Sequence, residues 1–129
     1  MADFNEKLNE LTNTKDTTSE FDQNDVEQNK VMAILAYISI LVLIPLFAAK
    51  ESKFARYHTN QGLILCICEI IVWVIFSILG IIPFIGIIFR ILNVVISLGF
   101  LALAILGIIN AANGKAKELP LIGKFTILK

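Results

Sequence analysis

The sequence predicts an all-α membrane protein: a bundle of three transmembrane helices, with a short interfacial helix after the first and a disordered acidic N-terminal tail. The main observation is an apolar stretch from Val31 to Ile109 that contains six charged residues. The chain is 57% hydrophobic and 17% charged, whereas soluble domains carry about 25% charged residues. An apolar stretch of this length is more than the core of a 129-residue soluble domain can bury.

The predicted acidic tail covers residues 1–24, and the transmembrane helical domain covers residues 25–129. Eight of the eleven acidic residues precede Val31, together with many Asn and Thr residues. Such a composition does not support a packed core and favours disorder. Asn24 followed by Glu27 has the form of a capping box, which predicts a helix that begins near the domain boundary.

The three predicted spans are about 31–49, 61–82 and 87–111. The first has a length of about 28 Å as a helix, enough for the hydrocarbon core, and Pro45 is expected to kink its last turns. The remaining apolar stretch is too long for one crossing. Its paired helix breakers lie at Pro83–Gly86, which leaves about twenty residues on each side for a span.

The basic residues near the span ends predict the orientation. Lys50, Lys53 and Arg56 lie in the first loop, and four lysines follow Asn113. With three spans these two groups share one side of the membrane and the acidic tail lies on the other. The positive-inside rule therefore predicts an N-outside, C-inside protein. The absence of an organellar transit segment favours the plasma membrane of a bacterium.

Glu69 is the strongest candidate for a functional side chain. It lies roughly 10 Å below the predicted membrane boundary, where a carboxylate costs several kcal/mol unless it is protonated, hydrated or paired. On a continuous helix His58, Gln61 and Glu69 share one face. Two interpretations remain open. The three side chains form a hydrated polar groove that acts as a conduction path, or the Glu69 carboxyl is neutral or hydrogen-bonded to Ser97 or Ser39 and holds the bundle together.

A second set of residues is predicted to contact lipid or a partner. It comprises Lys50, Lys53, Phe54, Arg56, Tyr57 and Arg90. The loop members form a basic and aromatic face suited to an interfacial helix on anionic lipid. Arg90 is about 14 Å from Glu69 along the membrane normal, too far for a direct pair within one hairpin. We expect Arg90 to extend towards the outer headgroups.

Small residues in the third span predict close helix packing. These residues are Gly99, Gly107 and Ala111, and the last two have the small-xxx-small spacing. Packing inside the chain and packing between protomers both fit this spacing. The predicted partners are the lipid bilayer and either further copies of the chain, in a homo-oligomer, or another membrane protein.

No enzymatic motif accompanies these features, and we expect that the protein is not an enzyme. The sequence has one histidine and no phosphate-binding glycine loop or nucleophile elbow. Cys66 and Cys68 point about 200° apart on a helix and cannot share a metal easily. No cofactor, metal site or nucleic-acid surface is predicted.

Two stretches carry a family resemblance. Ser52–Gly62 has a basic, aromatic, His-x-x-Gln entry into a span, and Asn113–Gly123 has the matching end. Together with Pro45 they resemble a small prokaryotic membrane-protein family similar to the import component of the chloroplast inner-envelope translocon. The resemblance covers about residues 31–125 and implies a helical bundle with a protein-conducting or transport-associated role. The positions it marks as characteristic are Arg56, His58 and Gln61.

The resulting functional prediction is a transport- or protein-translocation-associated component that forms a conducting path as an oligomer. The plant import component is thought to have four spans, so with three spans a further wall would come from another protomer. The alternative is a non-conducting membrane scaffold, or an immunity protein against a membrane-active toxin. Glu69→Gln distinguishes these readings, because a conduction path should respond to it while the fold survives.

Overall fold

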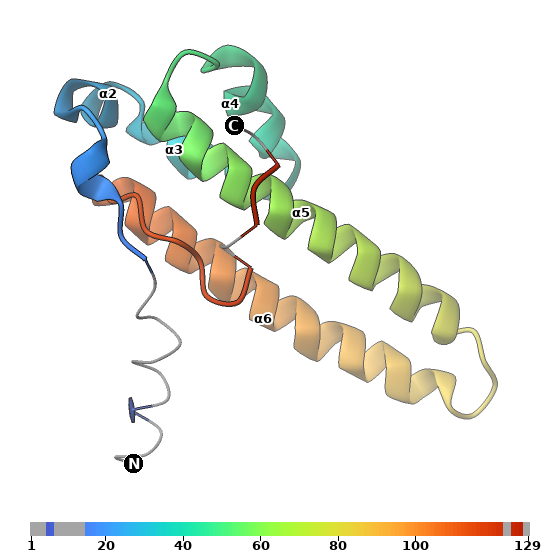
Figure 1. The fold of residues 1–129 in the computed structure, drawn as a ribbon. Coiled ribbons are helices and arrows are strands. Elements are labelled where there is room, and N and C mark those ends of the chain that lie inside the picture. Colours follow the sequence, from blue (N-terminus) through green and yellow to red (C-terminus); the bar gives the residue numbers. More distant parts are fainter. Residues whose placement is uncertain (1–4, 7–14, 123–124, 128–129) are drawn as a thin grey trace.

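The computed structural model describes residues 5–6, 15–122 and 125–127. They form a long antiparallel hairpin with a smaller helical unit at one end (Figure 1). We call this unit the head; it comprises the short helices between residues 18 and 48, the adjoining ends of the two long helices and the segment after residue 112. The elements in chain order are η1 (Thr18–Glu20), α2 (Gln23–Gln28), α3 (Lys30–Leu35), η2 (Ser39–Val42), α4 (Leu43–Ala48), α5 (Lys53–Leu79) and α6 (Gly86–Ala112). Within the described residues the structure has no strand apart from one isolated bridge between Asp16 and Lys117. The predicted all-helical class is confirmed.

The hairpin is built from α5 and α6, which are 27 residues each and apolar enough to cross a membrane. Only 17% and 11% of the residues in their most apolar windows are buried within the chain, whereas the core helices of soluble proteins are mostly buried. The turn falls where the sequence predicts it, at Pro83–Gly86. A Cβ at Gly86 would lie 2.4 Å from the Gly80 carbonyl oxygen, so a glycine is needed for this tight return.

The predicted first span, 31–49, does not form one membrane-crossing helix. Helix α3 ends at Leu35, and Ser39 has a left-handed backbone with φ of 45°. The chain therefore folds back, and α4 returns towards the head surface. Pro45 is the third residue of α4, where a backbone N–H has no acceptor within the helix, so proline breaks no bond. By length and composition the described chain has two candidate spans instead of three.

The core lies in the head, where α3 contacts both α5 and α6. It is formed by buried side chains from α2, α3, the two long helices and the segment after α6, and its members include Val26, Ala33, Tyr37, Phe54, Leu65, Ala111 and Leu119. Helices α3 and α5 approach closely because Gly62 has no side chain. A Cβ at Gly62 would lie 1.8 Å from the Ala36 carbonyl oxygen.

The N-terminal and C-terminal segments lie together at the head end of the hairpin. The Thr17 N–H donates to the Ala116 carbonyl oxygen at 2.9 Å, and the Glu118 N–H donates to the Lys15 carbonyl oxygen at 3.0 Å. Residues 15–22 are mostly exposed to solvent, and part of this segment pairs with the C-terminal segment, whereas the sequence predicts a disordered tail. Residues 1–4 and 7–14 lie outside the described residues. This pairing disagrees with the predicted placement of the two segments on opposite sides of the membrane.

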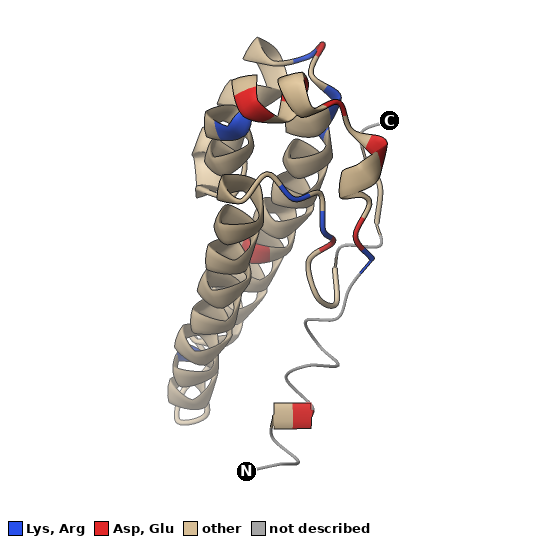
Figure 2. Ribbon diagram, turned by 90° about the vertical axis from the view of Figure 1, so that its left-hand side faces the viewer, with Lys and Arg blue, Asp and Glu red and all other residues tan. Residues whose placement is uncertain are grey.

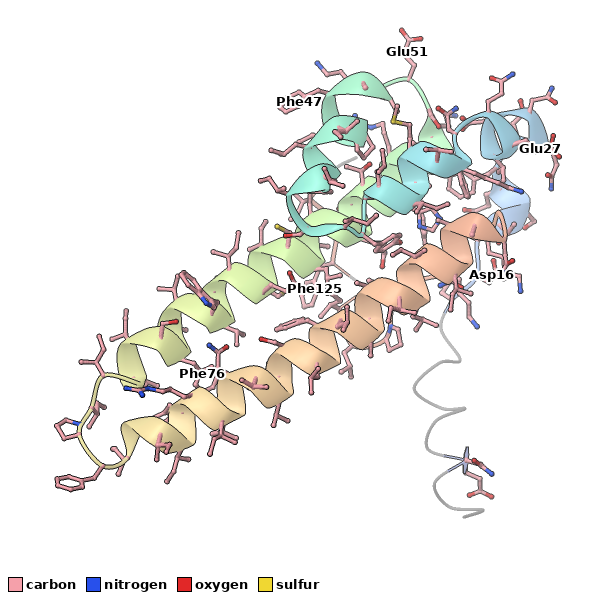
Figure 3. All side chains as sticks on the ribbon, turned by 180° about the vertical axis from the view of Figure 1, so that it is seen from behind. Asp16, Glu27, Phe47, Glu51, Phe76 and Phe125 are labelled. Atoms are coloured by element: carbon pink, nitrogen blue, oxygen red, sulfur yellow. The ribbon has the colours of Figure 1, made fainter. Side chains whose placement is uncertain are left out.

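Charged residues are concentrated in the head and are rare along the hairpin. Figure 2 shows Lys, Arg, Asp and Glu gathered in the head and in the two segments beside it, with few along the hairpin. In Figure 3 the apolar side chains of α5 and α6 project outward along the hairpin, and Phe47 of α4 points away from the head. Phe47 is 66% exposed. Apolar surface of this extent is stable where hydrocarbon covers it.

Candidate functional site

His58 joins three parts of the head. Its ring is fully buried, with Nδ1 2.5 Å from the Tyr37 hydroxyl and Nε2 2.8 Å from the Lys115 carbonyl oxygen. A carbonyl can only accept, so Nε2–H donates to Lys115 and Nδ1 accepts from the Tyr37 O–H. The ring therefore links α5 to Tyr37, which lies two residues beyond the end of α3, and to the C-terminal segment.

Two further polar residues of α5, Asn60 and Gln61, form hydrogen bonds with the C-terminal segment. The Gln61 side-chain oxygen accepts from the Leu119 N–H at 2.9 Å. Asn60 donates to the Phe125 carbonyl oxygen at 3.0 Å and accepts from the Ile127 N–H at 2.6 Å. We name His58, Asn60 and Gln61 the C-terminal clamp. The sequence analysis did not single out Asn60, although it belongs to four consecutive polar residues, 58–61, at the entry to an apolar helix.

The structure does not join His58, Gln61 and Glu69 into one groove. His58 is 0% and Gln61 2% exposed, because the C-terminal segment covers them. Glu69 lies farther along α5, half-buried, and lines a separate apolar cavity of about 550 Å³. Ser39 and Ser97 line the same cavity, but the Glu69 carboxyl makes no hydrogen bond to a described side chain or backbone group. The clamp is thus a structural network, and the cavity is a distinct feature.

Asp25 caps the start of α5 from outside that helix. Its carboxylate accepts from the Ser52 hydroxyl at 2.5 Å, from the Phe54 N–H at 3.0 Å and from the Asn29 amide at 2.8 Å. Burial raises the pKa of Asp25, but these hydrogen bonds outweigh it and hold the pKa below the usual range. The cap of α2 is Asp22, which accepts from the Asn24 N–H, and not the predicted Asn24.

Replacing Asp25 by Asn should destabilise the head at neutral pH and weaken its response to acid. A folded-state pKa below the unfolded one adds stability above the unfolded pKa, and this stability is lost as the pH falls through the folded pKa. We expect a loss of about 1 kcal/mol for this partly exposed group, measured as thermal unfolding in detergent between pH 7 and pH 3. Glu27→Gln, which removes an exposed carboxylate on the same helix, is the control and should leave the acid response unchanged. An equal acid response in wild type and Asp25→Asn would contradict this role.

Two aromatic residues predicted to contact lipid or a partner point into the head instead. Phe54 is 0% exposed and meets Phe21 and His58 edge to face. Tyr57 is half-buried between the same two rings. Lys50 and Lys53 are exposed on the head surface and remain available for such contacts, and Arg56 is half-buried. Both aromatic residues lie in the first turns of α5, where Phe54 belongs to the head core and Tyr57 packs against it.

Arg90 and the small residues of α6 have structural roles. Arg90 does not pair with Glu69: its Nε and Nη2 atoms donate to the Gly80 carbonyl oxygen at 3.2 and 3.0 Å, which satisfies the end of α5. Gly107 packs against the Tyr37 ring and Ala111 is fully buried, so this packing is internal. Gly99 has nothing within 4 Å of its Cβ position and packs against no described residue.

The described side chains offer no assembled centre for metal chemistry. Among residues 5–6, 15–122 and 125–127, no group of three or more His, Cys, Asp or Glu residues could hold a metal ion. Cys66 and Cys68 are free thiols. What the structure builds is a hydrogen-bonded head on an apolar hairpin, with an apolar cavity beside Glu69.

These features define a small helical membrane protein with a compact polar head, in which buried polar side chains tie the chain ends to the longest helices. The chain belongs to the magnetosome magnetite crystal formation protein family, MamF/MmsF, whose model matches residues 28–126. The match runs from the end of α2 to the segment held by the clamp. It therefore covers the hairpin and most of the head.

Three relatives support this assignment. The chain is 30% identical over 99 residues to the magnetosome protein MamF of Paramagnetospirillum magneticum, with 76% of this chain and 82% of the relative covered. It is 30% identical over 93 residues to MmsF of the same organism, with 71% and 79% covered. MamF of Magnetospirillum gryphiswaldense is 29% identical over 99 residues, with 76% and 82% covered. No solved structure matches the chain.

The family assignment corrects two predictions. The resemblance to the chloroplast import component is wrong, because the matching family is MamF/MmsF. The predicted transport- or translocation-associated function is wrong as well, and so is its alternative of a scaffold or immunity protein: the relatives are magnetosome proteins of crystal formation. The association with a bacterial membrane agrees with these relatives and with the two apolar helices.

Proposed function

We propose that this protein is an integral membrane protein that takes part in the formation of magnetite crystals. The observation that carries the proposal is the extent of the family match, residues 28–126, which coincides with the folded unit formed by α3 to the clamped segment. A match restricted to the apolar helices would reflect composition. This match also includes the buried hydrogen-bonding residues of the head, such as His58 and Gln61.

In this proposal α5 and α6 cross the bilayer and the head lies at the cytoplasmic membrane surface. The head end holds most of the basic residues, among them Lys30, Lys50, Lys53 and Lys115, whereas Arg90 lies near the turn. The positive-inside rule then assigns the head to the cytoplasm. Exposed apolar side chains of α4 favour its insertion at the interface.

This orientation predicts that both chain ends lie in the cytoplasm. Residues 15–18 pair with residues 116–118, so the two segments share one side of the membrane. Reporter fusions at each terminus that distinguish cytoplasm from periplasm should both report the cytoplasm. A periplasmic signal from either terminus would contradict the two-span arrangement.

Expression in a P. magneticum strain that lacks MamF and MmsF should test the function directly. We expect the chain to reach the membrane fraction and to shift magnetite crystal length, measured by electron microscopy, towards the wild-type value. Gly99→Ala, at a position with no packing neighbour, should act like the unmodified chain. Gly62→Ala, which disturbs the contact between α3 and α5, should restore less. Unchanged crystals in cells with normal amounts of membrane-bound protein would refute the proposal.

A further inference from the structure

The cavity that contains Glu69 has the dimensions and position of a ligand site. It lies between the bend after α3 and the two long helices, with a volume of about 550 Å³. Small-molecule sites range from about 300 to 1,000 Å³ and are mostly apolar with a few polar groups. Here the polar groups come from three different elements: Ser39, Glu69 and Ser97.

The cavity opens sideways towards lipid. Glu69 is eight residues beyond Gln61, which places it about 12 Å farther along α5. Three of the lining side chains, Ile70, Trp73 and Leu101, are 55%, 62% and 54% exposed. Because these residues belong to the apolar hairpin, an occupant enters from the membrane and needs an apolar part that remains in hydrocarbon.

The lining also selects the chemistry of the occupant. Tyr37, Trp73 and Phe100 present aromatic surface to the cavity, which suits a flat ring. The Glu69 carboxyl makes no hydrogen bond to a described group, and a carboxyl at membrane depth is expected to be protonated, hydrated or paired. A protonated carboxyl and two serine hydroxyls are hydrogen-bond donors, and carbonyl oxygens on the ring are their natural acceptors.

We propose that this cavity binds a quinone-type membrane lipid, with the ring between the aromatic side chains, a ring carbonyl on Glu69, and the apolar tail in the bilayer. A phospholipid chain would fill the apolar volume but would leave the carboxyl and the hydroxyls without acceptors. The inference concerns binding and does not depend on the role in crystal formation.

Trp73 makes the proposal measurable, because it lines the cavity and is the single tryptophan of the chain. Titration of the purified full-length protein in lipid nanodiscs with decylubiquinone should quench its fluorescence in a saturable manner. Glu69→Ala should weaken the apparent affinity about tenfold, which corresponds to the loss of one buried hydrogen bond. Ala104→Leu, which fills the cavity, should abolish saturation.

The control variant is Glu51→Ala, which removes an exposed carboxylate of the head far from the cavity lining and should bind like wild type. Quenching that rises linearly, equally in wild type and Ala104→Leu, would show partition into the bilayer alone and overturn the proposal. Saturable quenching with the same apparent affinity in wild type and Glu69→Ala would indicate apolar contact without recognition of the ring oxygen. This result would also overturn the proposal. Circular dichroism melts of each variant exclude unfolding as the cause.

Discussion

Replacement of His58 by Ala is expected to release the C-terminal segment and to lower the free energy of unfolding by about 3–5 kcal/mol. The ring is in contact with three aromatic rings at centroid distances of 4.8 to 5.4 Å, those of Phe54, Tyr57 and Tyr37. Its removal leaves a cavity and takes the hydrogen-bond partner from the Lys115 carbonyl oxygen. Chemical denaturation in detergent and amide hydrogen exchange of residues 116–119 would measure both effects.

Tyr37→Phe is the matched control for this prediction. It removes the hydroxyl that donates to His58 Nδ1 and keeps the ring that packs against Gly107. The expected loss is smaller, about 1–2 kcal/mol, and exchange at residues 116–119 should stay slow because His58 still holds Lys115. If the C-terminal segment remained equally protected in His58→Ala, the role assigned to the clamp would be wrong.

The hairpin was predictable because its signals are local. Two apolar stretches of about twenty residues and a proline–glycine turn between them determine where the chain reverses. The predicted spans, 61–82 and 87–111, fall on α5 (Lys53–Leu79) and α6 (Gly86–Ala112). The start of α5 lies earlier than predicted, because Ser52 and Asp25 cap it within the basic loop.

The first apolar stretch was mispredicted because hydropathy measures composition and not continuity. Residues 31–49 are apolar enough for a span, yet Ser39 adopts a left-handed backbone and the helix stops before it. The break lets α3 pack across α5 and α6, where Ala36 fits against Gly62. That tertiary contact outweighs the tendency of the stretch to continue as one helix. The residues at the break carry no helix-breaking proline or glycine that would have marked it in the sequence.

The candidate functional site was also predicted only in part, because its contacts are between distant segments of the chain. His58 and Gln61 were singled out from their residue types at a span entrance, but their partners lie 57 and 58 residues away in the chain. Helical periodicity predicts which side chains of one helix share a face. It does not predict which distant segment covers that face. The two stretches that were noted together, Ser52–Gly62 and Asn113–Gly123, do contact each other. The cavity around Glu69 depends on the bend at Ser39, whereas the sequence predicted a continuous helical span through this residue with a kink at Pro45.

Gly62→Ala should be among the most damaging single methyl additions to this chain, with an expected loss of about 3 kcal/mol of stability. The new Cβ would lie 1.8 Å from the Ala36 carbonyl oxygen and 2.6 Å from its carbonyl carbon. Both atoms belong to the backbone of Ala36, the residue directly after α3, so no side-chain rotation relieves the overlap. Helix α3 must move away from α5, and the packing of Tyr37 beside it must loosen.

Gly99→Ala is the comparison that isolates this contact from the general effect of glycine. Both glycines lie inside 27-residue helices, and alanine is the better helix former by up to about 1 kcal/mol. At Gly99 the Cβ meets nothing within 4 Å, so this variant should be neutral or slightly stabilised. Thermal unfolding of both variants in the same detergent should therefore give shifts of opposite sign or clearly different size. Equal shifts would mean that α3 does not pack on α5 as closely as the structure shows, and the head would need a different arrangement.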